Sequence, residues 1–214
     1  MSSSPASPTF PILYTERLEL RMFDPSRPSD YKAILTIYES DFILRTVGDP
    51  GVHTREDLDL RSQKFHLRPR TSDNDGDEDD ADSSTKPLPS HPWHLIYLRG
   101  TDTLVGTVSL FHRHPLPYPD MGYAVLEPYM GRGFATEAAR AALRWWTDDM
   151  GVPNIWAAVF DTNAASHRVA QKIGFVHGGM VTTLLRDGRV MQSIAFVQPD
   201  MGRCLDGLTV DLRP

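Results

Sequence analysis

A chain of 214 residues, 40% hydrophobic and 23% charged, has the composition of one globular domain with a sizeable core. No apolar run approaches the eighteen or so residues that a membrane-spanning helix needs, so we expect no membrane partner. Residues 1–11 lack the basic and apolar regions of a secretory signal, and the single Cys204 cannot form an internal disulfide. Together these features predict a cytoplasmic protein.

The net charge of −6 is concentrated in one segment of the chain. Between Thr71 and Ser90, seven acidic side chains stand against Lys86 alone, so the remaining sequence is electrically balanced. A balanced domain gives no reason to expect nucleic acid as a partner. Because residues 71–91 also lack a hydrophobic period, we expect a disordered insertion. It is either a solvated linker or an acidic segment that attracts a basic substrate.

The first half of the chain contains strand and helix patterns on both sides of this insertion. Residues 17–23 alternate apolar and polar side chains, which predicts a half-buried strand. A helix follows with Ser29 as its expected N-cap, and Thr54 with Asp57 forms the capping box of a second helix. Residues 93–112 predict a β-hairpin, and residues 120–127 one further strand.

The second half predicts two helices, one strand and a hairpin. Apolar residues recur with helical spacing over 135–146, and residues 154–160 form an apolar run typical of a buried strand. A further helix begins near Asn163 and ends at Gly174, and a hairpin turns at Asp187 and Gly188. The pattern predicts a mixed α/β fold, a mostly antiparallel sheet flanked by helices. We expect one domain over 15–198, a disordered lead-in over 1–14 and a tail over 199–214.

The stretch "YMGRGFATEAA" (Tyr129–Ala139) joins two glycines to the start of a helix. Helix N-termini carry free N–H groups and partial positive charge, and Gly131 and Gly133 would let a phosphate approach closely. Arg132 adds a cation. The alternative is a simple glycine-rich turn before an amphipathic helix. Two other phosphate-binding motifs are excluded: a Walker loop needs a lysine that is absent here, and Thr136 stands where a dinucleotide fingerprint has its third glycine.

This stretch resembles the acyl-CoA pyrophosphate loop of the GCN5-related N-acetyltransferases (GNAT), whose pattern is Arg/Gln-x-x-Gly-x-Gly/Ala. Gly133 and Ala135 match the pattern, and Met130 departs from it. Residues 15–34 and 163–179 resemble segments of the RimJ/RimL-like, ribosomal-protein-alanine acetyltransferase branch of that superfamily. The similarity runs from about residue 15 to 197, and it implies the acyl-CoA N-acyltransferase fold with acetyl-CoA as co-substrate.

The resemblance also implies which residues would hold the cofactor. The pantetheine arm would pair with the backbone of Val125 and Leu126 and would accept a hydrogen bond from Asn163, which is equally placed to cap a helix. The pyrophosphate would lie on a loop made of Met130, Gly131, Arg132, Gly133, Phe134, Ala135 and Thr136.

Two residues are candidates for catalysis. Asp120 falls where many members of the superfamily have a glutamate base, although it could equally be an ordinary edge-strand aspartate; Glu127 is the reserve candidate. Ser166 would donate a proton to the departing thiolate, unless it only bonds a helix carbonyl. The tyrosine acid of some relatives has no counterpart, because Ala170 occupies its position.

Three functions remain open from the sequence. The first is an acetyl-CoA-dependent N-acetyltransferase that acts on a primary amine, with a protein N-terminus as one candidate acceptor. The second is a small-molecule acetyltransferase of the antibiotic or polyamine type, and the third is a CoA-binding module without turnover. No metal is expected, because neither His91 and His94 nor His112 and His114 have further ligands at a suitable spacing. A monomer and a homodimer are both compatible with the sequence.

Overall fold

The computed structural model describes residues 10–67, 86–203 and 205–213. Within them, one mixed sheet has the strand order β1-β2-β3-β4-β5-β6-β8-β7-β9, and every neighbouring pair is antiparallel except β5–β6 and β7–β9. This confirms the predicted fold class. The strands are β1 (Leu13–Tyr14), β2 (Leu18–Met22), β3 (Trp93–Leu98), β4 (Leu104–Phe111), β5 (Asp120–Val125), β6 (Trp156–Phe160), β7 (Val176–Leu184), β8 (Val190–Val197) and β9 (Thr209–Asp211).

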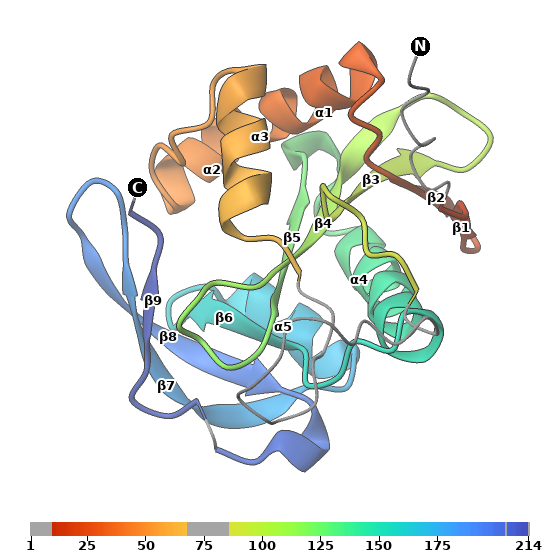
Figure 1. Cartoon of the computed structure of the whole chain (residues 1–214). Helices are drawn as coiled ribbons and strands as arrows, with labels where there is room; N and C mark the ends of the chain where they lie inside the picture. The colour runs from red at the N-terminus through yellow and green to blue at the C-terminus, as the bar shows by residue number, and fades with distance from the viewer. Residues whose placement is uncertain (1–9, 68–85, 204, 214) are drawn as a thin grey trace, which may run out of the picture.

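Helices cover both faces of the sheet (Figure 1). On one face, apolar side chains of α1 and α3 pack with β3 and β4 in a core that contains Ile34, Leu58 and Trp93. On the other face, the fully buried Ala138 and Ala142 of α4 let that helix approach β2, β4 and β5 closely. The helices are α1 (Pro28–Tyr38), α2 (Asp41–Thr46), α3 (Arg55–Lys64), α4 (Phe134–Arg144) and α5 (Ala164–Lys172).

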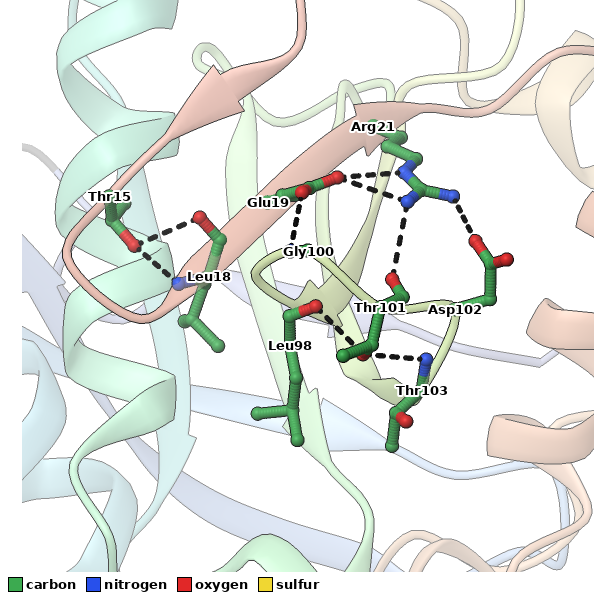
Figure 2. Close-up of polar contacts among 9 residues, drawn as sticks. All are labelled: Thr15, Leu18, Glu19, Arg21, Leu98, Gly100, Thr101, Asp102 and Thr103. Atoms are coloured by element: carbon green, nitrogen blue, oxygen red, sulfur yellow. Dashed lines mark hydrogen bonds and ion pairs between the residues drawn. The ribbon is translucent and has the colours of Figure 1, made fainter.

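A polar network fastens β2 to the turn between β3 and β4 (Figure 2). Glu19 accepts a hydrogen bond from the Gly100 amide at 2.8 Å and pairs with Arg21 at 3.0 Å, and Arg21 also pairs with Asp102 at 3.0 Å. The Gly100 amide and the Arg21 guanidinium hold the pKa of Glu19 below its ordinary value. The network therefore ties β2 to the turn that joins β3 and β4.

The ends of the helices agree in part with those predicted from the sequence. The Thr54–Asp57 capping box is present at the start of α3, and Gly174 follows α5 in a left-handed conformation, as predicted. The prediction that Ser29 caps the first helix is wrong. Arg27 occupies the cap position, because Pro28 has the fixed φ that suits the first turn and starts the helix earlier.

The structure adds three short elements that the patterns did not predict. Ser40 caps the six-residue α2, and β1 pairs with β2. The segment expected as a tail after residue 198 contributes β9, which pairs with β7. The described helices include none long and apolar enough to cross a membrane.

The expected disordered segments fall only partly within the described residues. Residues 1–9 and 68–85 lie outside them, and with them most of the lead-in and of the acidic insertion. Their neighbours are packed. Phe10 makes an edge contact with Trp145 at 6.0 Å between ring centroids, and His91 stacks on Phe23 at 5.0 Å and bonds Asp59 at 2.9 Å. Residues that pack against the rest of the domain therefore occur within both segments that the sequence predicted to be disordered.

His94 is buried in the core under α4. Its ring meets the edges of Trp145 and Trp146 at centroid distances of 5.0 and 6.0 Å, and neither ring nitrogen has a hydrogen-bond partner among the described residues. Burial disfavours the charged imidazolium and lowers the pKa of His94 to about 3.

We therefore expect His94 to contribute to the loss of stability in acid. Between the ordinary histidine pKa of 6.5 and about 3, the unfolded chain binds a proton at His94 that the folded chain does not, so stability falls as the pH falls. His94→Leu should reduce the slope of unfolding free energy against pH by up to ~1.4 kcal/mol per unit, measured by denaturant titration at pH 4 to 7. His66→Leu, at an exposed position, is the matched control, and equal slopes in wild type and His94→Leu would contradict the assignment.

Candidate active site

The parallel strands β5 and β6 pair at one position only, Asp120 opposite Trp156. Beyond this point β5 continues to pair with β4, and β6 with β8, but the two strands separate from each other. In Figure 1, β2 and β3 lie toward the upper right, β4 and β5 in the middle, and β6–β9 toward the lower left. Beyond Asp120 and Trp156 the facing edges of β5 and β6 are not paired with each other, and we call the place where they separate the opening.

The backbone of β5 determines which groups face this opening. The Leu126 amide donates to Val105 of the β4 side at 2.8 Å, so it is not available to a ligand in the opening. Successive residues of an extended strand direct their N–H groups to opposite edges. The backbone groups of Val125 are therefore directed toward β6, and of the two residues predicted to pair with pantetheine only Val125 has its N–H available.

The glycine loop lies at the wide end of the opening, between β5 and α4. Gly131 and Gly133 have φ values of +74° and +80°, which L-residues rarely adopt, and Gly133 is the N-cap of α4. A Cβ at Gly131 would meet no atom within 4 Å, and one at Gly133 would meet only Arg17, at 3.5 Å. The first N–H groups of α4 thus open onto free space that is bordered by a cation.

Arg17 connects this loop to the start of the sheet. It donates to the Arg132 carbonyl at 2.9 Å, pairs with Glu137 of α4 at 2.6 Å and covers the Phe134 ring at 4.6 Å. Burial alone would raise the pKa of Glu137, but hydrogen bonds from Thr15 and Arg17 outweigh it, so this pKa lies below its ordinary value. The pair neutralises an acid that would otherwise repel a phosphate from the helix N-terminus. No pattern in the sequence indicates this contact.

Asn163 and Ser166 lie in the first turn of α5, which follows β6. The Asn163 side-chain oxygen accepts from the Ser166 amide at 3.1 Å, so it caps the helix as the alternative interpretation proposed. This leaves its amide N–H groups free for a ligand, with no hydrogen bond to any described residue. The Ser166 carbonyl accepts a hydrogen bond from the Tyr123 hydroxyl at 2.9 Å, and the Ser166 hydroxyl also lies within hydrogen-bonding reach of the Tyr123 phenol.

Tyr123 is a residue that the sequence interpretation missed. Its hydroxyl extends from β5 to α5 and donates to the Ser166 carbonyl at 2.9 Å, close to Ala170. Burial raises the pKa of the Tyr123 phenol, so the group remains protonated at neutral pH. The structure therefore has a hydroxyl beside Ala170, the position where some members of the GNAT superfamily have a tyrosine, but it belongs to another strand.

Asp120 begins β5 at the narrow end of the opening. Its side chain is 10% exposed and forms an ion pair with Arg113, whose side chain is 11% exposed. One carboxylate oxygen, Oδ1, has no partner among the described residues. Glu127 lies at the other end of the strand and pairs with Arg45 of α2 at 2.5 Å on the surface, away from the narrow end. Among residues 10–67, 86–203 and 205–213, no three metal-binding side chains lie together.

Comparison with known proteins identifies the family. The family model described as "Acetyltransferase (GNAT) domain" matches residues 17–176. The chain belongs to the GNAT acetyltransferase family. It is 27% identical over 174 residues to the uncharacterized N-acetyltransferase YoaA of Bacillus subtilis (strain 168), an alignment that covers 80% of this chain and 86% of the relative. We conclude that the protein is an acyltransferase of the N-acetyltransferase class.

Solved structures share the GNAT fold. A GNAT-family acetyltransferase from Bacillus anthracis superposes with a TM-score of 0.61 at 21% identity, over 87% of this chain and 96% of the other. A ribosomal-protein-S5-alanine acetyltransferase from Vibrio fischeri gives 0.60 at 17% identity, over 88% and 96%. At these identities the likeness concerns the fold alone. Members of the family use acetyl-CoA as co-substrate, which suits an open strand edge beside a glycine-lined helix N-terminus.

We expect Gly133→Val to weaken acetyl-CoA binding about tenfold or more. A branched side chain would enter the free space at the first amides of α4, where the pyrophosphate is expected. Gly151→Val is a matched control, because Gly151 also has a positive φ of +67° and open space around its Cβ position but lies outside the loop. Calorimetric titration of both variants, with circular dichroism to confirm folding, measures the effect. Equal affinities in the two folded variants would contradict the assignment of the loop.

Proposed function

We propose that this GNAT protein transfers the acetyl group of acetyl-CoA directly to a primary amine within a ternary complex. The observation that carries the proposal is the opening between β5 and β6, which leads from the glycine loop at its wide end to Asp120 at its narrow end. Its shape suits an extended thioester, with phosphates at the helix N-terminus and the acyl group near the narrow end.

The reaction requires the protein to hold the thioester, to accept the proton of the attacking amine and to stabilise the departing thiolate. The amine nitrogen attacks the thioester carbonyl carbon, the C–N bond forms and the C–S bond breaks. Val125 is proposed to hold the pantetheine arm through its backbone, and Asn163 through its free amide. Orientation of this kind converts a bimolecular attack into an effectively intramolecular one.

Groups on either side of the opening are proposed to accept the proton of the amine and to donate one to the thiolate. Because Arg113 occupies one oxygen of Asp120, the other oxygen is the atom proposed to take the proton of the attacking amine. The departing thiolate would receive a proton or a hydrogen bond from Tyr123 or Ser166. Rotation of the Tyr123 hydroxyl away from the Ser166 carbonyl would be sufficient, since the phenol remains protonated.

Two classes of amine are candidates for the acceptor. A protein N-terminus follows from the resemblance to the RimJ/RimL-like branch, and the Vibrio fischeri ribosomal-protein acetyltransferase supports it through fold alone. A small-molecule amine is the second candidate, because the side chains around Asp120 are largely buried and would admit a compact acceptor more readily than a chain. Both candidates use the same transfer chemistry.

The test is thiol release from acetyl-CoA with and without amines, in wild type and in Asp120→Asn. Wild type should release CoA only as amine is acetylated. Asp120→Asn should lower turnover by about 10²- to 10⁴-fold, the usual contribution of a positioned base, and leave acetyl-CoA affinity nearly unchanged. Raising the pH should partly restore the variant, because more of the amine is then neutral.

Two outcomes would count against these assignments. Acetyl-CoA binding without amine-dependent thiol release would favour a CoA-binding module over an enzyme. Full activity of Asp120→Asn across the pH range would leave the amine proton to water and remove the base assignment.

Tyr123→Phe should lower turnover without recovery at high pH, because the lost group serves the leaving thiolate rather than the amine. Tyr31→Phe is the matched control, since the Tyr31 hydroxyl also donates one hydrogen bond, to Asp59 at 2.6 Å. Ser166→Ala, measured beside them, separates the two candidate donors. An active Tyr123→Phe with an impaired Ser166→Ala would assign the donor role to the serine.

A further inference from the structure

Two arginines share one buried aromatic site beside Asp120. The guanidinium of Arg61, from α3, lies 5.5 Å from the Phe65 ring centroid and 5.6 Å from that of Phe111. The guanidinium of Arg113, from the loop after β4, lies 5.3 Å from each of the same two rings. Arg61 also lies 5.6 Å from the Tyr38 ring. Two positive charges are thus held together over one pair of aromatic rings.

The charges in this cluster do not balance. Asp120 is the one carboxylate that contacts it among the described residues, and its ion pair is with Arg113. The Nε atoms of both arginines are buried and have no hydrogen-bond partner in the described structure. Burial of its guanidinium lowers the pKa of Arg61, and the neighbouring Arg113 charge acts in the same direction, against Tyr38 and Asp120, which raise it. An excess positive charge held partly out of water, with buried donors unused, is costly unless an anion joins it.

The cluster lies where an acceptor would have to bind. Asp120 is the β5 residue that pairs with Trp156, so it marks the narrow end of the opening. Met121 is buried against the α4 core, and side chains alternate along a strand, so Asp120 faces the side of the sheet that α1 and α3 cover. Arg61 and Arg113 reach it from that same side. The unused donors therefore lie close to the point where the amine is proposed to meet the acyl group.

We propose that the acceptor is a small primary amine that also carries a carboxylate, and that Arg61 and Arg113 bind this carboxylate. The proposal rests on the proposed acetyltransferase function and names its substrate class. A guanidinium donates two parallel hydrogen bonds to a carboxylate, and such charged pairs are stronger than neutral ones. Because the arginines adjoin Asp120, the amine and the carboxylate must lie a few ångströms apart, as they do in an amino acid.

The experiment compares amino acids with their own carboxamides as acceptors, for instance alanine, glutamate and phenylalanine. The carboxamide keeps the amine and side chain but removes the negative charge, and its less basic amine is more often neutral. Wild type should nevertheless favour the acids by about tenfold or more in kcat/KM, since a hydrogen bond to a charged group contributes about 1.5–3 kcal/mol. Peptides with neutral first residues should be poor acceptors.

Arg61→Met is the decisive variant, because it leaves the Arg113–Asp120 ion pair intact and keeps an apolar stem over the rings. The ratio of kcat/KM for an amino acid to that for its carboxamide should fall toward one, whereas the affinity for acetyl-CoA should not change. The melting temperature should stay level or rise, because an unbalanced buried charge has been removed; a purely structural arginine would lower it. Arg61→Lys should keep part of the preference. Arg55→Met, on the same helix and 4.4 Å from the Tyr31 ring, is the control that should keep all of it.

The outcomes separate this inference from the proposed function. Turnover of carboxamides as fast as acids in wild type, or an unchanged preference in Arg61→Met, would overturn the carboxylate assignment and leave the acetyltransferase proposal standing. Failure to bind acetyl-CoA, with no thiol release for any amine, would overturn both.

Discussion

The site depends on one feature of backbone hydrogen bonding, the single point of pairing between β5 and β6. A parallel pair that continued past Asp120 and Trp156 would close the sheet and leave no place for an extended thioester. Because the strands separate, backbone groups in the middle of the domain remain free for a ligand strand to use. The helices α4 and α5 follow these two strands, so their N-termini open onto the same space.

Local features of this architecture could be predicted from the sequence, because short-range physics determines them. The capping box of Thr54 and Asp57 needs only neighbouring residues, and the strand alternation of residues 17–23 reports the burial of Leu18 and Leu20. The two positive-φ turns at Gly131 and Gly133 follow from the motif, since glycine's freedom of φ is a local property, and the phosphate loop proposed there rests on them. By contrast, the six-residue α2 has too few turns to produce a periodic pattern.

Contacts between distant segments could not be predicted in this way. Arg17 directly precedes β2, and nothing in the sequence pattern indicates that it reaches Glu137 in the first turn of α4. The same holds for Asp120, whose position in the chain suggested a base but not a partner at Arg113. Tyr123 was missed because a hydroxyl was sought on the helix that contains Ala170, whereas the fold supplies one from a strand. Sequence patterns identify the elements, and tertiary packing decides which side chains meet.

Both outer edges of the sheet are formed by very short strands, two residues in β1 and three in β9. Long, flat strand edges invite pairing between molecules and hence aggregation, and short edge strands reduce that risk. Without β9, the nine-residue β7 would present unpaired backbone along that side. Truncations or fusions that displace residues 209–211 would therefore impair solubility before they affect catalysis, because the protected edge lies outside the opening where acetyl transfer is proposed.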